Sequence, residues 1–282
     1  MSHIVVTGGA GRLGREVVAD LLGRGHAVLA VDRVKPETLQ CRFLPVELTD
    51  AAAVHDVLRG AEAVIHLGAV PGPTVQPPST TFATNVMSTF HVMQAAAAHG
   101  LKKAVFASSV FTLGWHEDAD RYWPRYVPVD EQHPLAPLEA YGLSKQIGEG
   151  ICATVSAASG MPTVSLRIMN VIQKDGYEAL PWPAPTRERG VRFVLWPYVD
   201  VRDAAISCRQ ALEAETAGHE AMFIAAEDTR FDAATSELLA ELAPQVEIRQ
   251  PLQGSAGVIS IQKARRLIGF QPKYGWQAVR KK

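Results

Sequence analysis

The sequence has few cysteines and no long hydrophobic run. Its 282 residues include only Cys41, Cys152 and Cys208, which are far apart and odd in number, so a disulfide framework is not expected. No apolar stretch reaches the roughly 18 residues that a membrane-spanning helix needs. The first residues run directly into a strand-like segment, without the charged and apolar regions of a secretory signal. These absences predict a cytoplasmic protein with no membrane partner.

A surplus of charge of either sign is also missing. The chain has 28 Lys and Arg against 29 Asp and Glu, a net charge of −1, so no nucleic-acid partner is expected. None of the nine histidines stands in an HExxH, HxH or Cys/His knuckle spacing, and we predict no metal site. The densest polar cluster, His116-Glu117-Asp118, is interpreted as a solvated loop. Since the composition argues against a nucleic-acid partner, we expect the partner to be a small-molecule substrate.

Apolar runs and stretches of helical period alternate along the first two thirds of the chain. We expect helices at residues 13–25, from Thr49 or Asp50 onward, at 81–98 and at 139–158. We expect strands at 4–6, 27–31, 43–48, 63–67, 103–108 and 163–169. This order predicts an α/β fold of the Rossmann type, a doubly wound parallel sheet with helices on both faces.

The last third of the chain breaks this rhythm. Residues 173–192 are interpreted as a loop, 193–199 and 221–226 as strands, and 203–213, 236–242 and 260–268 as helices. We therefore expect a small C-terminal substrate lobe that is interleaved with the sheet. In this division residues 1–170 form the dinucleotide-binding domain, completed by about 194–227. Residues from about 171 to 193 and from 228 to 282 form the lobe.

A glycine-rich turn lies between the first expected strand and the first helix. It reads TGGAGRLG and places Gly8, Gly11 and Gly14 three residues apart. Glycines at these positions allow a tight turn and a close approach to a pyrophosphate, which the helix N-terminus attracts. The alternative is a plain left-handed turn, but the position after the first strand favours a dinucleotide site.

Asp32 ends the second expected strand, 18 residues after Gly14. A carboxylate there accepts hydrogen bonds from the adenosine ribose and repels a 2′-phosphate, which favours NAD. Arg33 follows it and could instead pair with a 2′-phosphate, so NADP is the less favoured cofactor. A surface aspartate at a strand end is the remaining alternative.

Tyr141 and Lys145 stand four residues apart in a predicted helix, so they share one face. A phenol has a pKa near 10 and is a poor base at neutral pH. A fixed ammonium beside it would stabilise the phenolate, and lowering the pKa by about three units takes roughly 4 kcal/mol. The spacing alone also occurs by chance on surface helices.

Taken together, these motifs resemble the extended short-chain dehydrogenase/reductase superfamily, in its NAD-dependent epimerase/dehydratase branch. The resemblance covers nearly the whole chain. Besides the glycine turn and the Tyr141–Lys145 pair, it rests on Glu47-Leu48, on His66-Leu67-Gly68-Ala69, on Asn85, on the Phe106–Ser109 and Leu166–Asn170 segments, on Tyr198–Ala205 and on Lys263–Phe270.

The resemblance implies roles for these residues. Tyr141 would be the general base or acid, Lys145 would lower its pKa and hold the nicotinamide ribose, and Ser109 would donate to the reacting oxygen. Asn170 would touch substrate, or else cap a loop, and Ser108 would contact the cofactor or be a core serine. The implied cofactor-binding residues are Gly8, Gly11, Arg12, Leu13, Gly14, Asp32, Arg33, Glu47, Leu48, Leu67, Gly68, Ala69, Asn85, Ser108, Tyr141, Lys145 and Ile168.

Three departures from the branch bear on the substrate. Trp196, followed by Pro197, stands where nucleotide-sugar epimerases carry one phosphate-binding arginine. Gln250, beside Arg249, stands where they carry the second. The turn expected after Asn170 is replaced by Val171-Ile172-Gln173-Lys174. A diphosphate binds poorly without guanidinium contacts, so a nucleotide-sugar is the less favoured substrate.

The segment from Phe106 to Gly114 and the Tyr141–Lys145 run are closer to uronate-dehydrogenase-like members, which oxidise a free sugar acid with NAD. Their substrate-carboxylate arginine is missing, because Tyr177-Glu178 occupies the region where it is expected. Arg187, Arg189 and Arg192 are alternatives, and we interpret each as a solvated loop charge.

The sequence predicts an NAD-dependent oxidoreductase that moves a hydride between a hydroxyl-bearing carbon of a small sugar, sugar-acid or polyol-like substrate and nicotinamide. The alternative is a sugar epimerase or dehydratase, nucleotide-sugar enzymes included, that uses tightly bound NAD without net redox. A non-catalytic dinucleotide sensor is disfavoured by Ser109, Tyr141 and Lys145. A homodimer is expected through the helices at 81–98 and 139–158, unless the loops at 71–79 and 110–137 cover them in a monomer.

Overall fold

The computed structural model describes residues 2–36, 38–114, 122–187 and 192–277. Its centre is a seven-stranded sheet in the order β10-β7-β5-β4-β1-β2-β3, and its strand pairs are parallel. The strands are β1 (His3–Thr7), β2 (Ala27–Asp32), β3 (Arg42–Pro45), β4 (Ala63–His66), β5 (Lys103–Ser109), β7 (Thr163–Ile168) and β10 (His219–Ile224). The predicted doubly wound parallel sheet is confirmed.

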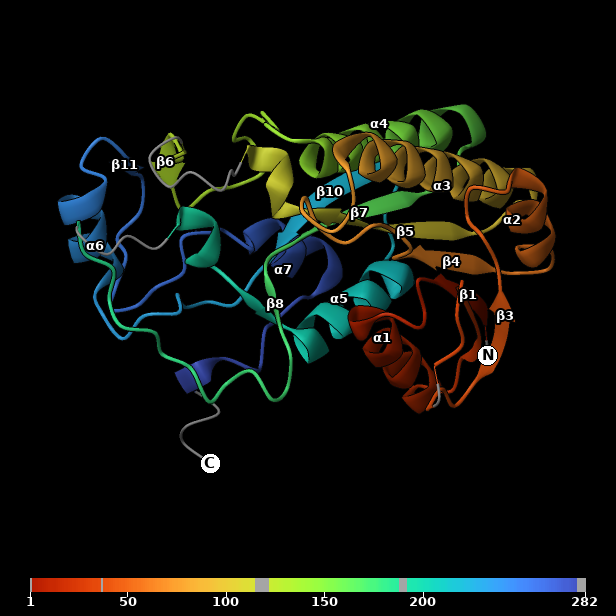
Figure 1. The fold of residues 1–282 in the computed structure, drawn as a ribbon, viewed down its shortest axis with the longest axis horizontal. Helices are drawn as coiled ribbons and strands as arrows, with labels where there is room; N and C mark the ends of the chain where they lie inside the picture. The colour runs from red at the N-terminus through yellow and green to blue at the C-terminus, as the bar shows by residue number, and fades with distance from the viewer. Residues whose placement is uncertain (1, 37, 115–121, 188–191, 278–282) are drawn as a thin grey trace.

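Helices cover both faces of the sheet (Figure 1). One face carries α1 (Arg12–Gly23) and α5 (Val201–Glu213), and the other carries α2 (Ala51–Val57), α3 (Pro78–Ala98) and α4 (Ala140–Ser159). Successive strand residues point to opposite faces, so Ile4 and Val6 join the core under α1 and α5, while Val5 joins the core under the other helices. The apolar runs are therefore buried on both sides, as a parallel sheet requires.

Side-chain caps set where several helices begin. Asp50 accepts hydrogen bonds from the backbone of Ala52 and Ala53, which confirms the expected start of α2. Glu139 caps α4 by accepting from the N–H groups of Tyr141 and Gly142. This cap holds Tyr141 in the first turn of α4.

Several short elements lie beyond the carboxyl ends of β5, β7 and β10, where β6, β11 and α6 gather at one end of the molecule (Figure 1). Here β6 (Tyr126–Val127) pairs with β11 (Glu247–Ile248), and β8 (Val171–Ile172) pairs with β9 (Val199–Asp200). The helix α6 (Thr235–Leu242) completes this part, whereas α7 (Gln262–Ile268) packs beside β10, where Lys263 pairs with Glu220. Segments far apart in the sequence thus meet at the edge where the strands end.

The strand expected at residues 193–199 is wrong. Phe193–Leu195 forms a short 3-10 helix, η3, and only Val199–Asp200 is a strand. Pro197 has no N–H for a ladder, and Trp196 packs against the rings of Trp123 and Phe231 instead of lying in a sheet.

Other boundaries shift by two or three residues. The strand expected at 43–48 ends at Pro45, and the one expected at 221–226 is β10, which begins and ends two residues earlier. The helix α3 begins at Pro78 rather than at residue 81, because proline fits the first turn of a helix. The helix α5 begins at Val201 rather than at 203, because Asp200 caps it by accepting from the N–H of Arg202.

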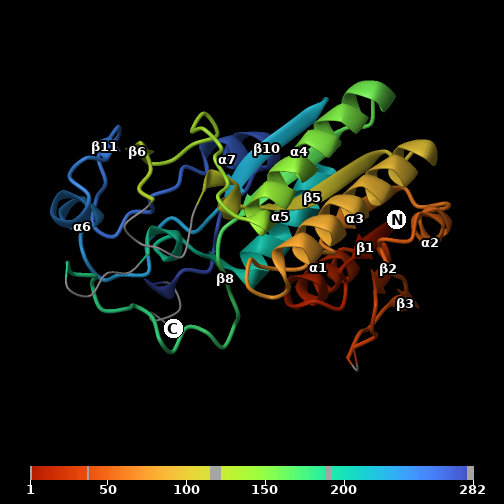
Figure 2. The same ribbon diagram turned by 45° about the horizontal axis from the view of Figure 1, so that its top comes forward.

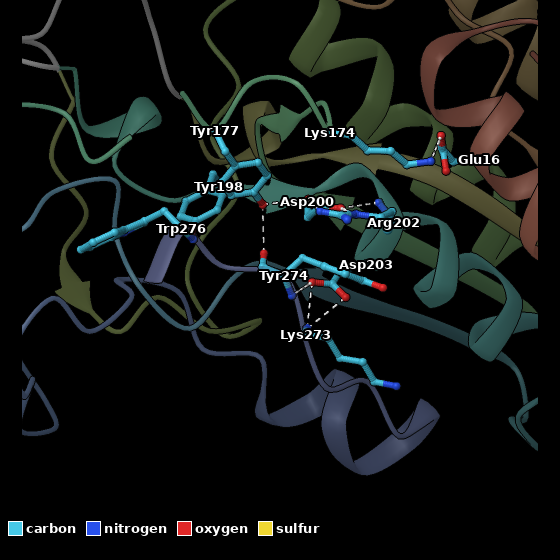
Figure 3. Close-up of polar contacts among 10 residues, drawn as sticks. All are labelled: Glu16, Lys174, Tyr177, Tyr198, Asp200, Arg202, Asp203, Lys273, Tyr274 and Trp276. Carbon is cyan, nitrogen blue, oxygen red and sulfur yellow. Dashed lines mark hydrogen bonds and ion pairs between the residues drawn. The ribbon is translucent and has the colours of Figure 1, made fainter. Parts of the chain in front are cut away.

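The acidic residues of the 198–205 segment hold the C-terminal part of the chain (Figure 3). The Asp203 carboxylate accepts from the backbone N–H of Lys273 over 3.0 and 2.9 Å and from that of Tyr274 over 2.9 Å. The Tyr177 hydroxyl lies 2.8 Å from Asp200 Oδ2 and 3.0 Å from the carbonyl oxygen of Tyr274. Arg202 Nη2 donates to Asp200 Oδ2 over 2.7 Å. These contacts are structural, since both carboxylates are occupied by the protein itself.

Candidate active site

The glycine turn between β1 and α1 is closely packed on itself and on the end of β4. Gly8 has a φ of +69°, and a Cβ there would lie 2.7 Å from the nitrogen of Gly68. A Cβ on Gly14 would lie 2.1 Å from the carbonyl oxygen of Gly8. Gly11 is the N-cap of α1, and no described side chain caps that end, which leaves its first N–H groups for a ligand. Gly11 and Arg12 are exposed there, and Leu13 is half-buried.

Asp32 lies against this turn. Its Oδ2 accepts from the N–H of Ala10 over 3.1 Å, and its Oδ1 accepts from the N–H of Arg33 over 2.8 Å. The carboxylate is therefore oriented by backbone groups, while the Arg33 side chain is exposed. The Asp32 carboxylate therefore lies beside the glycine turn, at the ends of β1 and β2.

His66 joins β4 to the same turn. Its Nδ1 is 2.7 Å from the Thr7 hydroxyl and its Nε2 is 3.1 Å from the Thr89 hydroxyl. Burial, with a smaller effect of the Lys145 charge, lowers the pKa of His66 to about 3, so the ring is neutral. The Thr7 oxygen also accepts from the N–H of Gly68 over 3.3 Å. These bonds hold the segment after β4 beside the glycine turn.

The other cofactor residues expected around β4 are placed as follows. Leu67, Gly68 and Ala69 are half-buried after β4, and Leu48 is buried so close that a Cβ on Gly68 would lie 2.2 Å from its Cδ1. Glu47 is exposed, and its Oε1 accepts from the backbone N–H and the hydroxyl of Thr49.

Asn85 is buried, and its amide is used within the protein. Its Oδ1 accepts from the N–H of Val70 over 2.7 Å, and its Nδ2 donates to the carbonyl of Val70 and to the Ser144 hydroxyl. Asn85 thus links the loop after β4 to α4. These contacts give it a positioning role, and a direct bond to a cofactor stays a prediction.

Ser109 and Tyr141 meet at the carboxyl end of β5. Ser109 ends this strand and pairs in register with Ile168 of β7, and its Oγ accepts from the N–H of Phe111. Burial raises the pKa of Tyr141 to about 12, and a hydrogen bond with Ser109 acts in the opposite direction. The ring of Phe111 packs edge-on against Tyr141 at 5.7 Å between centroids. The serine and the tyrosine of the motif are therefore in contact.

Lys145 lies one turn further along α4 and is buried. Its Nζ donates to the carbonyl of Ala107 over 2.9 Å and lies 5.7 Å from the centroid of the Tyr141 ring. Burial lowers the pKa of Lys145 to about 8, which leaves it mostly charged at neutral pH. We expected Lys145 to lower the pKa of Tyr141. In the structure the effect of burial is larger, and the pKa of Tyr141 lies above its ordinary value.

Ser108 points to a different set of partners. Its hydroxyl donates to Glu149 Oε1 over 2.6 Å, and Arg167 donates to both oxygens of the same carboxylate over 3.0 and 2.8 Å. All three residues are buried. These contacts fit a core serine at a strand end, and a cofactor contact of Ser108 stays a prediction.

Asn170 follows β7 and is exposed at the same edge. Its Oδ1 accepts from Arg230 Nη2 over 2.7 Å, a partner that sequence reasoning did not single out. Arg230 is a lone arginine shortly after an apolar strand, and that position is the one signal the sequence offers for it.

The loop arginines considered as carboxylate binders are placed elsewhere. Arg187 donates through Nε and Nη2 to the carbonyl of Glu241, Arg192 is exposed at the start of η3, and Arg189 lies outside the described residues, as does the 116–118 cluster. Within the described ranges, no helix is long and apolar enough to cross a membrane. In the same ranges, no group of three or more His, Cys, Asp or Glu side chains could hold a metal ion.

The structure also places the two positions at which nucleotide-sugar epimerases are expected to carry phosphate-binding arginines. Trp196 is fully buried among aromatic rings. Gln250 is exposed, and the guanidinium of its neighbour Arg249 lies 3.4 Å from the centroid of the Tyr126 ring and pairs with Glu247. Neither position therefore presents a guanidinium group, and the neighbouring Arg249 is used in a ring contact and an ion pair.

Comparison with known proteins defines the class. The sequence model of the NAD dependent epimerase/dehydratase family matches residues 4–179, and the chain belongs to this family. This membership confirms the resemblance drawn from the motifs.

Individual relatives point to two activities. The chain is 33% identical over 176 residues to a uronate dehydrogenase of Pseudomonas putida, a match that covers 59% of this chain and 60% of that protein. It is 31% identical over 193 residues to UDP-arabinose 4-epimerase 1 of Arabidopsis thaliana, covering 62% and 44%. The match thus spans less than two thirds of either relative.

Among solved structures, a short-chain dehydrogenase/reductase superfamily protein from Agrobacterium tumefaciens with bound NAD superposes with a TM-score of 0.77. It is 26% identical, and the match covers 99% of this chain and 95% of that one. A mutated uronate dehydrogenase gives a TM-score of 0.65 at 26% identity, covering 97% and 88%. The likeness to these structures therefore extends over almost the whole chain.

Proposed function

We propose that the protein is an NAD-dependent oxidoreductase that oxidises a hydroxyl-bearing carbon of a small sugar, sugar acid or polyol. The observation that carries this proposal is the Ser109–Tyr141 contact at the carboxyl end of β5, with Lys145 one turn away on α4. A hydroxyl pair beside a buried cation is suited to removing a proton from a substrate alcohol.

The dinucleotide would lie along the glycine turn. Close packing at Gly8 and Gly14 leaves no room for side chains, the uncapped N-terminus of α1 supplies N–H groups, and Asp32 is held ready to accept from ribose hydroxyls. These features favour NAD, because the carboxylate would repel a 2′-phosphate. When bound, NAD supplies the acceptor for the hydride.

The residues of α4 and β5 would handle the proton. Tyr141 would take the proton of the substrate hydroxyl and pass it to solvent, and bound NAD would supply the acceptor for the C–H hydrogen and its two electrons, so the oxidation would balance. Ser109 donates to the oxygen that becomes the carbonyl. Because burial raises the pKa of Tyr141 to about 12, its phenolate needs the positive charge of Lys145.

The test is the near-ultraviolet absorbance of NADH, measured with NAD and a panel of sugars, sugar acids and polyols. Net NADH formation is the expected result. Turnover of a sugar without net NADH would instead support the second candidate, an epimerase or dehydratase, which the match to the UDP-arabinose 4-epimerase favours. Trp196 stands against a UDP-sugar, because it is buried where the family's clamp arginine is expected.

We also propose that two copies associate through α3 and α4. These helices lie side by side on one face of the sheet (Figure 2). Their outer surface carries Met87, Phe90 and Leu143, which are 42%, 43% and 40% exposed. The charged residues of α4, Lys145 and Glu149, are buried, and α3 has none. Light scattering at micromolar concentration should give twice the 30.5 kDa of one chain, and a mass of one chain at all concentrations would contradict the dimer.

Two further expectations belong to this proposal. The cysteines Cys41, Cys152 and Cys208 are free thiols, which supports a reducing, cytoplasmic setting.

The substrate would be held by the lobe of residues from about 171 to 193 and from 228 to 282, over a dinucleotide domain of residues 1–170 and about 194–227.

A further inference from the structure

Arg230 is a buried arginine without an acidic partner. Three arginines in the described part of the chain are at least nine-tenths buried: Arg167, Arg209 and Arg230, at 6%, 6% and 5% exposure. Arg167 pairs with Glu149, and Arg209 pairs with Asp20 and Glu213. Among the described residues, Arg230 has no carboxylate within ion-pair distance.

The contacts of Arg230 leave part of its guanidinium unsatisfied. Nη2 donates to Asn170 Oδ1 over 2.7 Å, and the guanidinium carbon lies 4.7 Å from the ring centroid of Trp182 and 5.8 Å from that of Tyr198. Nε is buried and has no hydrogen-bond acceptor among the described atoms. An uncompensated buried charge costs several kcal/mol, and burial lowers the pKa of Arg230 to about 10, so it stays protonated at neutral pH. An anion bound beside Arg230 would therefore compensate this buried positive charge.

The guanidinium lies at the edge where the proposed chemistry occurs. Asn170, which it contacts, comes two residues after Ile168, and Ile168 pairs in register with Ser109. Asn170 is exposed, so the contact joins the buried Arg230 side chain to a residue at the surface. Arg230 itself comes from the segment after β10, which brings a cation of the C-terminal part to the end of the central strands.

We infer that Arg230, with Asn170 beside it, is the subsite that binds a carboxylate group of the substrate. The inference rests on the proposed function and narrows its substrate class to sugar acids. A guanidinium presents paired N–H groups whose geometry matches a planar carboxylate. The groups around it favour one negative charge over two, because the other contacts of Arg230 are the neutral amide of Asn170 and the rings of Trp182 and Tyr198.

The first experiment compares matched substrates. The ratio of kcat/KM for D-galacturonate to kcat/KM for D-galactose is measured for the wild type, Arg230→Gln, Arg230→Lys and Arg187→Gln. Loss of a charge-assisted hydrogen-bonded pair predicts that Arg230→Gln lowers this ratio by about 100-fold, with partial rescue in Arg230→Lys. Arg187→Gln removes the same charge from a side chain bonded to a backbone carbonyl, so the ratio should not change. An unchanged ratio in Arg230→Gln would overturn the inference.

A second variant tests the inference even if Arg230→Gln does not fold. Asn170→Asp is nearly isosteric and places a carboxylate beside the guanidinium, which should keep or raise the melting temperature while blocking the anion site. Calorimetric binding of D-galacturonate in the presence of NAD should then weaken by at least about tenfold. Wild-type affinity in a folded Asn170→Asp protein would contradict the assignment.

The outcomes separate this inference from the proposed function. If no substrate yields NADH but D-galacturonate binds to the wild type and not to Asn170→Asp, the subsite stands and the oxidoreductase proposal fails. If neutral sugars are oxidised and D-galacturonate neither binds nor reacts, the oxidoreductase proposal stands and the subsite fails. Tighter binding of D-galactose 6-phosphate than of D-galacturonate would overturn the assignment of a carboxylate ligand and indicate that the subsite binds a phosphate ester.

Discussion

Replacing Gly14 by alanine tests the link between the glycine turn and the cofactor. The new Cβ would lie 2.1 Å from the carbonyl oxygen of Gly8 and 2.8 Å from the Cα of Gly9. Both neighbours are backbone atoms, so the contact cannot be relieved by rotating a side chain. The Gly8 carbonyl would have to move by about 1 Å to restore an ordinary contact, and the turn would move with it.

The magnitude follows from two opposing effects. Overpacking with backbone displacement costs about 3 kcal/mol at the upper end of its range. The better helix propensity of alanine returns about 1 kcal/mol. The free energy of unfolding should therefore fall by about 2 kcal/mol, which is a decrease of about 3 °C in Tm for a chain of this size. The Kd for NAD should rise at least about tenfold, because the displaced turn no longer follows the pyrophosphate.

Thermal unfolding and calorimetric NAD titration measure both effects. Gly23→Ala is the matched control, because Gly23 ends the same helix and no described atom lies within 4 Å of a Cβ built there. That variant should keep its NAD affinity and be equal to or slightly more stable than the wild type. Wild-type stability and wild-type NAD affinity in Gly14→Ala would refute the reasoning about the turn.

Three other predictions concern the site. Tyr141→Phe should reduce kcat by at least about 100-fold while NAD still binds, and steady-state kinetics that match the wild type would remove Tyr141 from the mechanism. Asp32→Ala should shift the cofactor preference toward NADP, since Arg33 can then pair with a 2′-phosphate; titrations with both cofactors test this, and a wild type that already prefers NADP would contradict it. Burial lowers the pKa of Lys145 from 10.5 to about 8, so between these values the unfolded chain binds more protons and stability rises with pH. Urea unfolding at several pH values should therefore show a rise in this window that Lys145→Met lacks, and equal slopes for both proteins would disprove the shift.

Much of the fold could be predicted because its signals are local. A parallel sheet with helices on both faces buries its strands on both sides, so runs such as residues 4–6 and 63–67 stand out from the helical period around them. The family motifs are local as well, since the glycine turn and the Tyr141–Lys145 pair each lie within one short segment. The structure puts these segments at the carboxyl ends of β1 and β5, where a doubly wound sheet places its ligands.

Contacts between distant segments were beyond sequence reasoning. The periodicity around residues 193–199 suggests a strand, but Trp196 is drawn into an aromatic cluster with Trp123 and Phe231. The buried amide of Asn85 bonds to Val70 and Ser144, which only the packing of α3 against α4 brings together.

The sequence by itself determined the fold class, the glycine turn and the pairing of a tyrosine with a lysine on one helix face, because period and spacing act over a few residues. Only the tertiary structure decided which polar groups are satisfied by the protein and which are left for a ligand. Ser108 is bound to the Glu149–Arg167 pair, whereas Arg230 meets Asn170, 60 residues away in the sequence, and has no carboxylate within ion-pair distance among the described residues. The reason is physical: burial and charge pairing depend on neighbours in space, and those neighbours come from strands and loops far apart along the chain.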